Sequence, residues 1–262
     1  MPMKNAKGVT LVELLVGMAV GMILLGSIYM AVNVAQRSTS GIERKVTAQQ
    51  DLKPALDLMA MEIGMASYNP NYTSGLWLNP TTCAAAANQN YKGIQEATAN
   101  SITVEMDITN TPNSSGNCTG TDGNGALSDC NEIIRYAYLS GATDLRITRQ
   151  TLPCTSGTPS TSGAMPFLGD SAGSGTPRTV RVINDLNGNG VYDVGTDIPV
   201  FRYYDGAGTE IAATALPGSI PDIRRIEITL AVETEEIDPN TKQRRRLIYS
   251  TSVIPRNHVI IP

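Results

Sequence analysis

One long uncharged run dominates the N-terminal part of the chain. It extends over the 22 residues from Leu14 to Ala35, and only Glu13 is charged between the basic residues 1–8 and Arg37. At about 1.5 Å per residue, a helix of this length crosses a hydrocarbon core of roughly 30 Å. The pattern predicts a membrane-spanning helix over residues 9–36.

A second helical pattern follows, with apolar side chains on one face only. Over residues 37–67 the positions that share this face recur at steps of three and four. They are Ile42, Val46, Gln49, Leu52, Leu56, Met59 and Ile63. Pro54 is expected to bend this helix or to begin a fresh first turn, because proline lacks the amide donor. We expect an amphipathic helix that ends before Asn69 and covers a sheet.

Short alternating segments fill the remaining residues, 68–262. Strands are expected at 101–109, 132–139, 145–149, 178–184, 200–204, 224–233 and 247–254. In the sixth of these, Ile226, Ile228 and Leu230 share one face while Glu227 and Thr229 share the other. The last two strands form a hairpin. The predicted fold is therefore α+β: a long N-terminal helix packed on an antiparallel sheet with long loops.

The charge of the chain gives it no general attraction to nucleic acid. The formal net charge is -4 and the isoelectric point is near 5.1. One basic run, Lys242 and residues 244–246, could contact phosphates. It follows a turn, however, and the acidic Glu233, Glu235 and Glu236 lie on the preceding strand, where they are expected to pair with it. Nucleic acid is not expected as a partner.

Four cysteines all lie after residue 68, at Cys83, Cys118, Cys130 and Cys154. None forms the CxxC pair that zinc and redox sites use, and His258 is the only histidine, so disulfides are the simpler interpretation. In an exported domain two bridges are possible, with three pairings that the sequence leaves open. We favour Cys118 with Cys130 and Cys83 with Cys154.

The segment DLNGNGVYDVGTD resembles a calcium loop of the EF-hand kind in its spacing. The candidate ligands are Asp185, Asn187, Asn189, Val191 through its carbonyl, Asp193 and Asp197. The twelfth position, normally glutamate, holds Thr196, so the loop would have to adjust. An Asn- and Gly-rich turn is the other interpretation. Calcium is the one cofactor that the sequence suggests.

A serine-hydrolase motif is present and is not accepted. GDSAG, residues 169–173, fits GxSxG, and Asp222 and His258 would supply a possible chain order. A nucleophile elbow lies between a strand and a helix, whereas Ser171 lies in a Gly- and Ser-rich loop. His258 is expected at the surface, and no enzymatic activity is expected.

Glu13 is the residue that an ordinary membrane anchor does not explain, because a charge in a membrane segment costs about 2.5 to 3.5 kcal/mol on insertion scales. Here the chain resembles the type IV prepilin signature: a basic leader, residues 1–8, then a long apolar helix. The residues that carry the resemblance are Gly8, Val9, Thr10, Leu11, Val12 and Glu13. Val9 replaces the more usual phenylalanine, and Met30 stands where many major pilins have a proline.

The resemblance implies processing and assembly. Prepilin peptidase would cut after Gly8 and methylate Val9, and the helix would be retained. Glu13 would neutralise the freed amine of a neighbouring subunit. The implied location is the bacterial inner membrane, with a periplasmic head, and then the pilus. The implied partners are the peptidase, other major and minor pilins and the inner-membrane assembly platform.

Three segments of the predicted head resemble one subgroup of the type IV pilin-like proteins in particular. IIRYAYLSGATDLRITR, FRYYDGAGTEI and IRRIEITLAVETEE, with the following hairpin strand, are similar to PilW-type minor pilins and less closely to the J-type pseudopilin of type II secretion. The expected function is to initiate or cap a pilus. A secretion pseudopilin and a pilus-tip adhesin or DNA-binding subunit remain alternatives.

Overall fold

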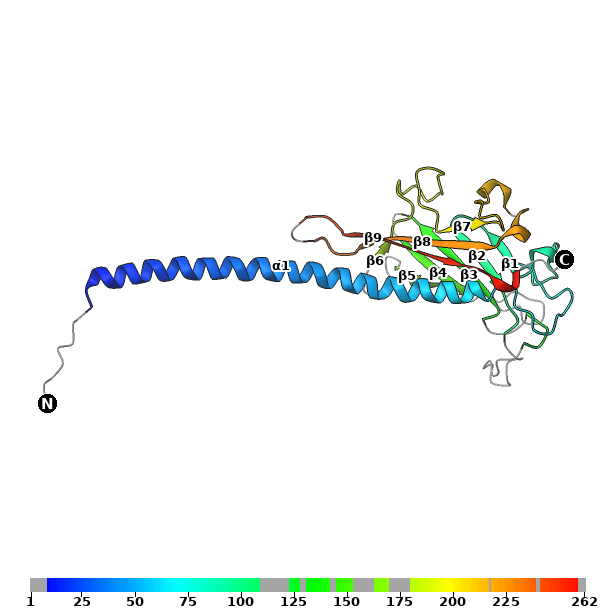
Figure 1. The fold of residues 1–262 in the computed structure, drawn as a ribbon, viewed down its shortest axis with the longest axis horizontal. Helices are drawn as coiled ribbons and strands as arrows, with labels where there is room; N and C mark the ends of the chain where they lie inside the picture. Colours follow the sequence, from blue (N-terminus) through cyan, green and yellow to red (C-terminus); the bar gives the residue numbers. More distant parts are fainter. Residues whose placement is uncertain are drawn as a thin grey trace.

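A single helix, α1 (Leu11–Gly64), runs the length of the protein and carries a β-rich head on its C-terminal half (Figure 1). The computed structural model describes residues 9–108, 123–127, 131–141, 145–152, 163–169, 180–216, 218–238 and 241–258. Short 3₁₀ helices add to the head: η1 (Gln89–Tyr91), η3 (Ala213–Ala215), η4 (Ile220–Asp222) and η5 (Arg256–His258).

The two predicted helical segments form one unbroken helix. Pro54 lies inside α1, so the prediction that it could begin a fresh first turn is wrong. Proline removes one amide donor, and packing of the surrounding turns compensates, since Leu52, Ala55 and Leu56 are all buried. The helix ends at Gly64, with Met65 as its C-cap, in agreement with the predicted end before Asn69.

The two halves of α1 have opposite environments. Its most apolar stretch is long enough to cross a membrane, and none of that stretch is buried inside the protein. The head covers the helix only further along, where Ala48, Leu52, Met59 and Ile63 are fully buried. Ile42 and Val46, predicted to face the head, are 61% and 43% exposed, because at this level the head lies against the side of the helix that carries Gly41 and Arg44.

The first sheet is an antiparallel meander in which each strand pairs with the next along the chain. Its strands are β1 (Ile94–Ala97), β2 (Ser101–Glu105), β3 (Ile133–Ser140), β4 (Leu145–Thr151) and β5 (Met165–Leu168). Strands β1 and β5 were not predicted. The β1–β2 and β3–β4 connections are short, as two-strand antiparallel hairpins allow, whereas residues 106–132 separate β2 from β3 and residues 152–164 separate β4 from β5.

The second sheet is built around one long strand. Its members are β6 (Val180–Val182), β7 (Phe201–Tyr204), β8 (Arg225–Thr234) and β9 (Arg246–Val253). The predicted hairpin is confirmed, because β9 pairs with β8 from Glu233↔Arg246 to Ile226↔Val253. Since β9 occupies that edge, β6 and β7 pair with the two ends of β8 along the other edge.

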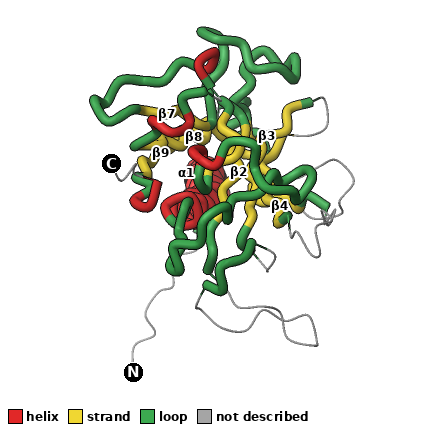
Figure 2. Tube along the Cα trace, turned by 90° about the vertical axis from the view of Figure 1, so that its right-hand side faces the viewer, coloured by secondary structure: helices red, strands yellow, loops and turns green. Residues whose placement is uncertain are grey.

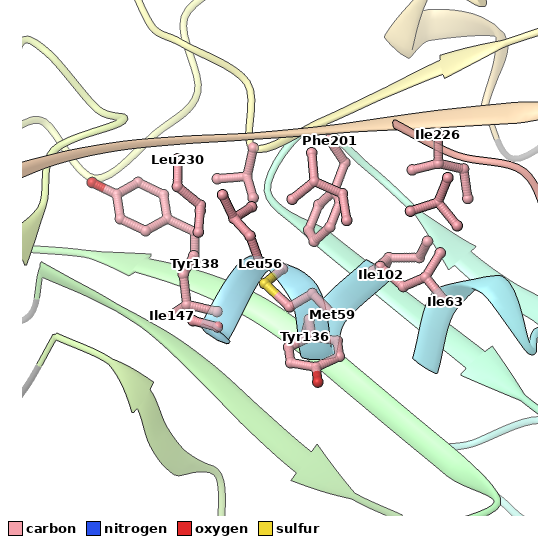
Figure 3. Packing of buried hydrophobic residues seen from close by; sticks show 14 of the residues in the cluster. Leu56, Met59, Ile63, Ile102, Tyr136, Tyr138, Ile147, Phe201, Ile226 and Leu230 are labelled. Atoms are coloured by element: carbon pink, nitrogen blue, oxygen red, sulfur yellow. The ribbon is translucent and has the colours of Figure 1, made fainter. Parts of the chain in front are cut away.

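The helix and both sheets share one core. Viewed along its axis, α1 lies between strands of the two sheets (Figure 2). Figure 3 shows Met59 of α1, Tyr136 of the first sheet and Phe201 of the second among the side chains that meet there. The sheets are also joined directly, because the Tyr138 hydroxyl donates to the Val182 carbonyl at 3.1 Å.

A buried ion pair connects α1 to the first sheet. Arg149 donates from Nη2 to Glu62 Oε1 at 2.7 Å and from Nε to Oε2 at 3.0 Å, and the Tyr136 hydroxyl donates to the same carboxylate. Glu62 is only 7% exposed. Three donors thus satisfy a carboxylate that would otherwise be costly to bury.

His258 is buried, so the prediction of a surface histidine is wrong. Its Nε2 donates to the Ile220 carbonyl at 2.8 Å, and its Nδ1 therefore accepts from Ser67 Oγ at 2.9 Å. Ser67 Oγ accepts in turn from the Gly93 amide at 2.9 Å. A side chain at position 93 would lie 2.3 Å from the Glu105 carbonyl, which explains the glycine. The network attaches the C-terminal segment to the end of α1.

Stability should fall in acid because of His258. Burial, with Lys92 and Arg224 nearby, lowers its pKa from about 6.5 to about 4. Between these pH values the unfolded chain binds a proton that the folded chain does not, so stability present above pH 6.5 is lost as the pH falls towards 4. The loss is about 3 kcal/mol. Urea unfolding at pH 7.5 and pH 4 should show it, and H258Q should show a correspondingly smaller pH effect; an equal effect in both proteins would contradict the assignment.

Candidate functional site

The start of α1 is organised by Thr10 and Glu13. The Thr10 side chain accepts from the Glu13 amide at 3.3 Å, and Glu13 Oε2 accepts from the Thr10 amide and hydroxyl at 2.9 Å each. This reciprocal pair is a capping box, which satisfies two otherwise free groups at a helix start. The sequence interpretation missed this role, although Thr-x-x-Glu is its usual signature.

The capping box leaves Glu13 able to bind a cation. Both hydrogen bonds that Thr10 donates end on Oε2 of Glu13. A carboxylate has about four acceptor positions on its two oxygens, so Oε1 can accept from a further donor. Glu13 lies at the exposed beginning of α1, where Val9 is 74% exposed. An ammonium from another chain can therefore approach. Gly8, the predicted cleavage position, lies outside the described residues.

Among the described residues, more than half of the exposed large hydrophobic side chains lie on the N-terminal half of α1 or directly before it. On α1 itself they form an exposed apolar surface whose members are each at least 46% exposed: Leu11, Val12, Leu14, Leu15, Val16, Met18, Val20, Met22, Ile23, Leu24, Leu25, Ile28, Tyr29, Met30, Val32 and Val34. A patch of this size is not stable in water, since soluble domains rarely expose more than a few hundred Å² of contiguous apolar surface. It requires lipid or neighbouring helices.

The predicted calcium loop is tightly organised by its own side chains. Asp185 accepts from Ser140 Oγ at 2.7 Å and from the amides of Gly188 and Gly190 at 2.6 and 2.8 Å. Burial opposes ionisation of Asp185, but these hydrogen bonds outweigh it and lower its pKa. Gly188 and Gly190 both have positive φ, which accounts for their identity.

The structure brings several, but not all, of the six candidate ligands to one point. Asp193 Oδ2 accepts from the side-chain amides of Asn187 and Asn189, at 2.6 Å each. Asp197 instead accepts from the amides of Leu186 and Asp193 at 2.9 and 2.8 Å, which closes the loop. Val191 is exposed. In the described part of the chain no three acidic, histidine or cysteine side chains are arranged to hold a metal ion.

Of the four cysteines, the structure describes only Cys83. It is disulfide-bonded and buried beside Trp77, Leu76 and Ala86 in a second, smaller core. Cys118, Cys130 and Cys154 lie outside the described residues, as does Ser171. The pairing therefore stays a prediction. Non-reducing peptide mapping should recover Cys83 with Cys154 and Cys118 with Cys130; recovery of either other pairing would contradict it.

The basic run after the β8–β9 turn faces acidic residues, as the sequence predicted. Arg244 lies 3.9 Å from Glu233 and 3.6 Å from Glu235, and Arg246 lies 3.8 Å from Glu233. These contacts are long and partly exposed, so they neutralise the arginines incompletely. Lys242 is exposed and has no acidic partner within 4 Å in the described residues.

Comparison with known proteins agrees with the N-terminal geometry. The family model of the prokaryotic N-terminal methylation motif matches residues 3–29, which include the predicted cleavage position, Glu13 and most of the exposed apolar surface. No curated protein and no solved structure shows significant similarity to the chain. The motif, the long apolar helix and the antiparallel sheets are together consistent with a type IV pilin-like protein anchored in the inner membrane.

Proposed function

We propose that the protein is a non-enzymatic minor pilin of the PilW kind that helps to initiate or cap a type IV pilus. The observation that carries this proposal is the division of α1 into a bare apolar half that begins with Glu13 and a half enclosed by the head. Such a chain can sit in the membrane and can then exchange lipid for neighbouring apolar helices. Prepilin peptidase, other pilins and the inner-membrane assembly platform are its proposed partners.

The form of the head favours an end of the filament over its shaft. Two sheets enclose α1, and loops extend from the head on more than one side (Figure 2). Subunits in a regular shaft must pack identical surfaces closely along the helix axis. A broad head with long loops fits better where one side remains free, as it does at a tip.

A deletion strain tests the proposed role. Loss of the gene should greatly reduce surface pili, and the intact gene on a plasmid should restore them. Unchanged piliation would contradict the initiator role. Normal piliation together with failed protein secretion would favour the pseudopilin alternative. Normal numbers of pili with lost adhesion or DNA uptake would favour the tip-receptor alternative.

We also propose that the loop from Asp185 to Asp197 binds calcium and so fixes the strands on either side. The loop holds three carboxylates and no basic residue, and Asn187, Asn189 and Asp193 already meet at one point. Binding would require the two amides to turn their oxygens inward, towards a cation that prefers oxygen ligands.

Calorimetry on the purified protein should detect this binding at a dissociation constant of about 0.1 to 1 mM. Asp185→Ala with Asp193→Ala should abolish the heat and the calcium-dependent rise in melting temperature. Asp205→Ala is the matched control, because Asp205 accepts similar turn hydrogen bonds, from Ala207 and Thr209, outside this loop. No heat and no melting shift in the wild-type protein would mean that the loop is only a turn.

A further inference from the structure

The β8–β9 hairpin reaches along α1 towards its N-terminal half, beyond the rest of the head (Figure 1). Its position on the helix is fixed by contacts. Arg44 donates to the Ile237 carbonyl at 2.6 Å and pairs with Glu236 at 2.6 Å. A side chain at Gly41 would lie 3.4 Å from Asp238 Oδ2, so the hairpin lies directly against the helix there.

This contact determines how far the hairpin is from a membrane that α1 spans. Gly41 is six residues beyond Ala35, the last residue of the uncharged run, and is therefore about 9 Å further along the helix. The headgroup layer extends about 5 to 8 Å beyond the hydrocarbon core on each side. The end of the hairpin thus lies at the outer boundary of the headgroups, within reach of long side chains.

The chemistry of the hairpin suits that position. An open hollow on it is lined by Glu233, Ile237, Lys242, Gln243, Arg244 and Arg246. Its lining holds three cationic side chains and one acidic side chain, and Arg244 also lies 3.6 Å from Glu235. Lys242 is exposed, the Arg246 side chain is 68% exposed, and Ile237 is 53% exposed. An exposed isoleucine beside cations is typical of surfaces that lie in a membrane interface.

The acidic residues of the hairpin do not cancel the positive charge of this surface. Glu236 has a 68% exposed side chain but is paired with Arg44 at 2.6 Å, and Asp238 is 2% exposed and paired with Arg245 at 2.7 Å. Glu235 lies 3.4 Å from Arg181. Each is engaged by a cation, two of which come from outside the hairpin. The surface around Lys242 is therefore locally cationic although the chain as a whole is acidic.

We propose that this hairpin surface, defined by Ile237, Lys242, Arg244 and Arg246, binds the anionic phospholipid headgroups of the membrane that α1 spans. This binding would hold the head at a fixed distance from the membrane and at a fixed tilt before assembly. Extraction of α1 from the membrane during assembly would break the contact between the hairpin and the headgroups. The proposal rests on the membrane anchoring of α1 and does not depend on which pilus or secretion system the protein serves.

The test measures the reactivity of Lys242 in the full-length protein. The protein is reconstituted in nanodiscs of phosphatidylglycerol or of phosphatidylcholine and treated with an amine-acetylating reagent, and peptide mass spectrometry follows each lysine. Acetylation of Lys242 should be slower in the anionic discs by about fivefold or more, since headgroups attract each nearby cation by roughly that factor. About 0.5 M salt should remove most of this protection.

Lys53 is the internal control. It is exposed on α1, twelve residues and so about 18 Å beyond Gly41, which exceeds the screening length in physiological salt. Its acetylation rate should be equal in the two lipids. Arg246→Gln should weaken the protection of Lys242, whereas Arg202→Gln, which changes a partly exposed arginine on β7, should leave it unchanged.

Three outcomes would overturn the proposal. The first is an equal Lys242 rate in both lipids while the protein remains in the discs, which would leave membrane anchoring intact. The second is equal protection of Lys53, which would show that the effect is not local. The third is protection of Lys242 by added duplex DNA but not by phosphatidylglycerol, which would identify the surface as a nucleic-acid contact.

Discussion

Replacing Arg149 by methionine should lower the free energy of unfolding of the head by about 3 to 5 kcal/mol. The substitution leaves the Glu62 carboxylate, 7% exposed, without the two charge-assisted hydrogen bonds at 2.7 and 3.0 Å. The Tyr136 hydroxyl alone cannot offset the cost of burying that charge. Because the pair joins α1 to the first sheet, the loss should weaken attachment of the head to the helix.

Urea unfolding of the detergent-solubilised protein measures this effect. Trp77 is the only tryptophan and is buried in the head, so its fluorescence reports on the head alone. Arg202→Met is the matched control, since Arg202 pairs with Glu210 at 3.7 Å while both side chains are more than 40% exposed. It should cost less than about 1 kcal/mol.

A second comparison separates the charge from the packing. Combining Arg149→Met with Glu62→Leu and Tyr136→Phe should recover most of the lost stability, because an apolar replacement of a buried ion pair is often neutral. If the single substitution costs no more than the Arg202 control, the ion pair does not hold the helix to the sheet.

Removing the Glu13 carboxylate should reduce incorporation into pili at least tenfold while processing after Gly8 continues. In the mechanism that the prepilin resemblance implies, the substitution removes the charge pair with a neighbouring amine, and cleavage does not require that pair. A charge pair in a low-dielectric setting contributes more than one in water, so assembly is expected to be sensitive to it. Immunoblots of sheared pili and of membranes measure both quantities.

The capping box makes the choice of substitution informative. Glu13→Gln can still accept from the Thr10 amide and so retains the capping interaction without the charge, whereas Glu13→Ala loses both. Equal defects in the two variants would assign assembly to the charge. Normal assembly of Glu13→Gln with failure of Glu13→Ala would mean that Glu13 acts by starting the helix.

The helix and the central strands could be predicted because each carries a strong local pattern. Strand β8 alternates in sequence from Ile226 to Leu230, and Ile226, Ile228 and Leu230 are fully buried, as that alternation predicts. Thr229 and Ala231 on the other face are buried as well, which the alternation did not predict. Strands β1 and β5 have only four residues each, and two of the four residues of β5 are exposed. They become strands because β1 pairs with β2 and β5 pairs with β4. Such pairing cannot be recognised from the local sequence pattern.

The burial of His258 was missed because it depends on contacts between residues distant in the sequence. His258 is buried because Ser67 and Ile220, 191 and 38 residues away, supply its hydrogen bonds. Ile42 and Val46 fit the predicted stripe, but periodicity cannot show that the head contacts Gly41 and Arg44 at this level instead. The Thr10–Glu13 box, in contrast, is local and was open to prediction from its spacing.

Intact-mass measurement of the protein isolated from membranes and from pili tests the central claim most directly. We predict a chain that begins at Val9, carries one N-terminal methyl group and retains all of α1, and we predict that Gly8→Leu accumulates as the uncut chain in the membrane. A mature chain cut after the apolar run, or an uncut chain in assembled pili, would contradict the account.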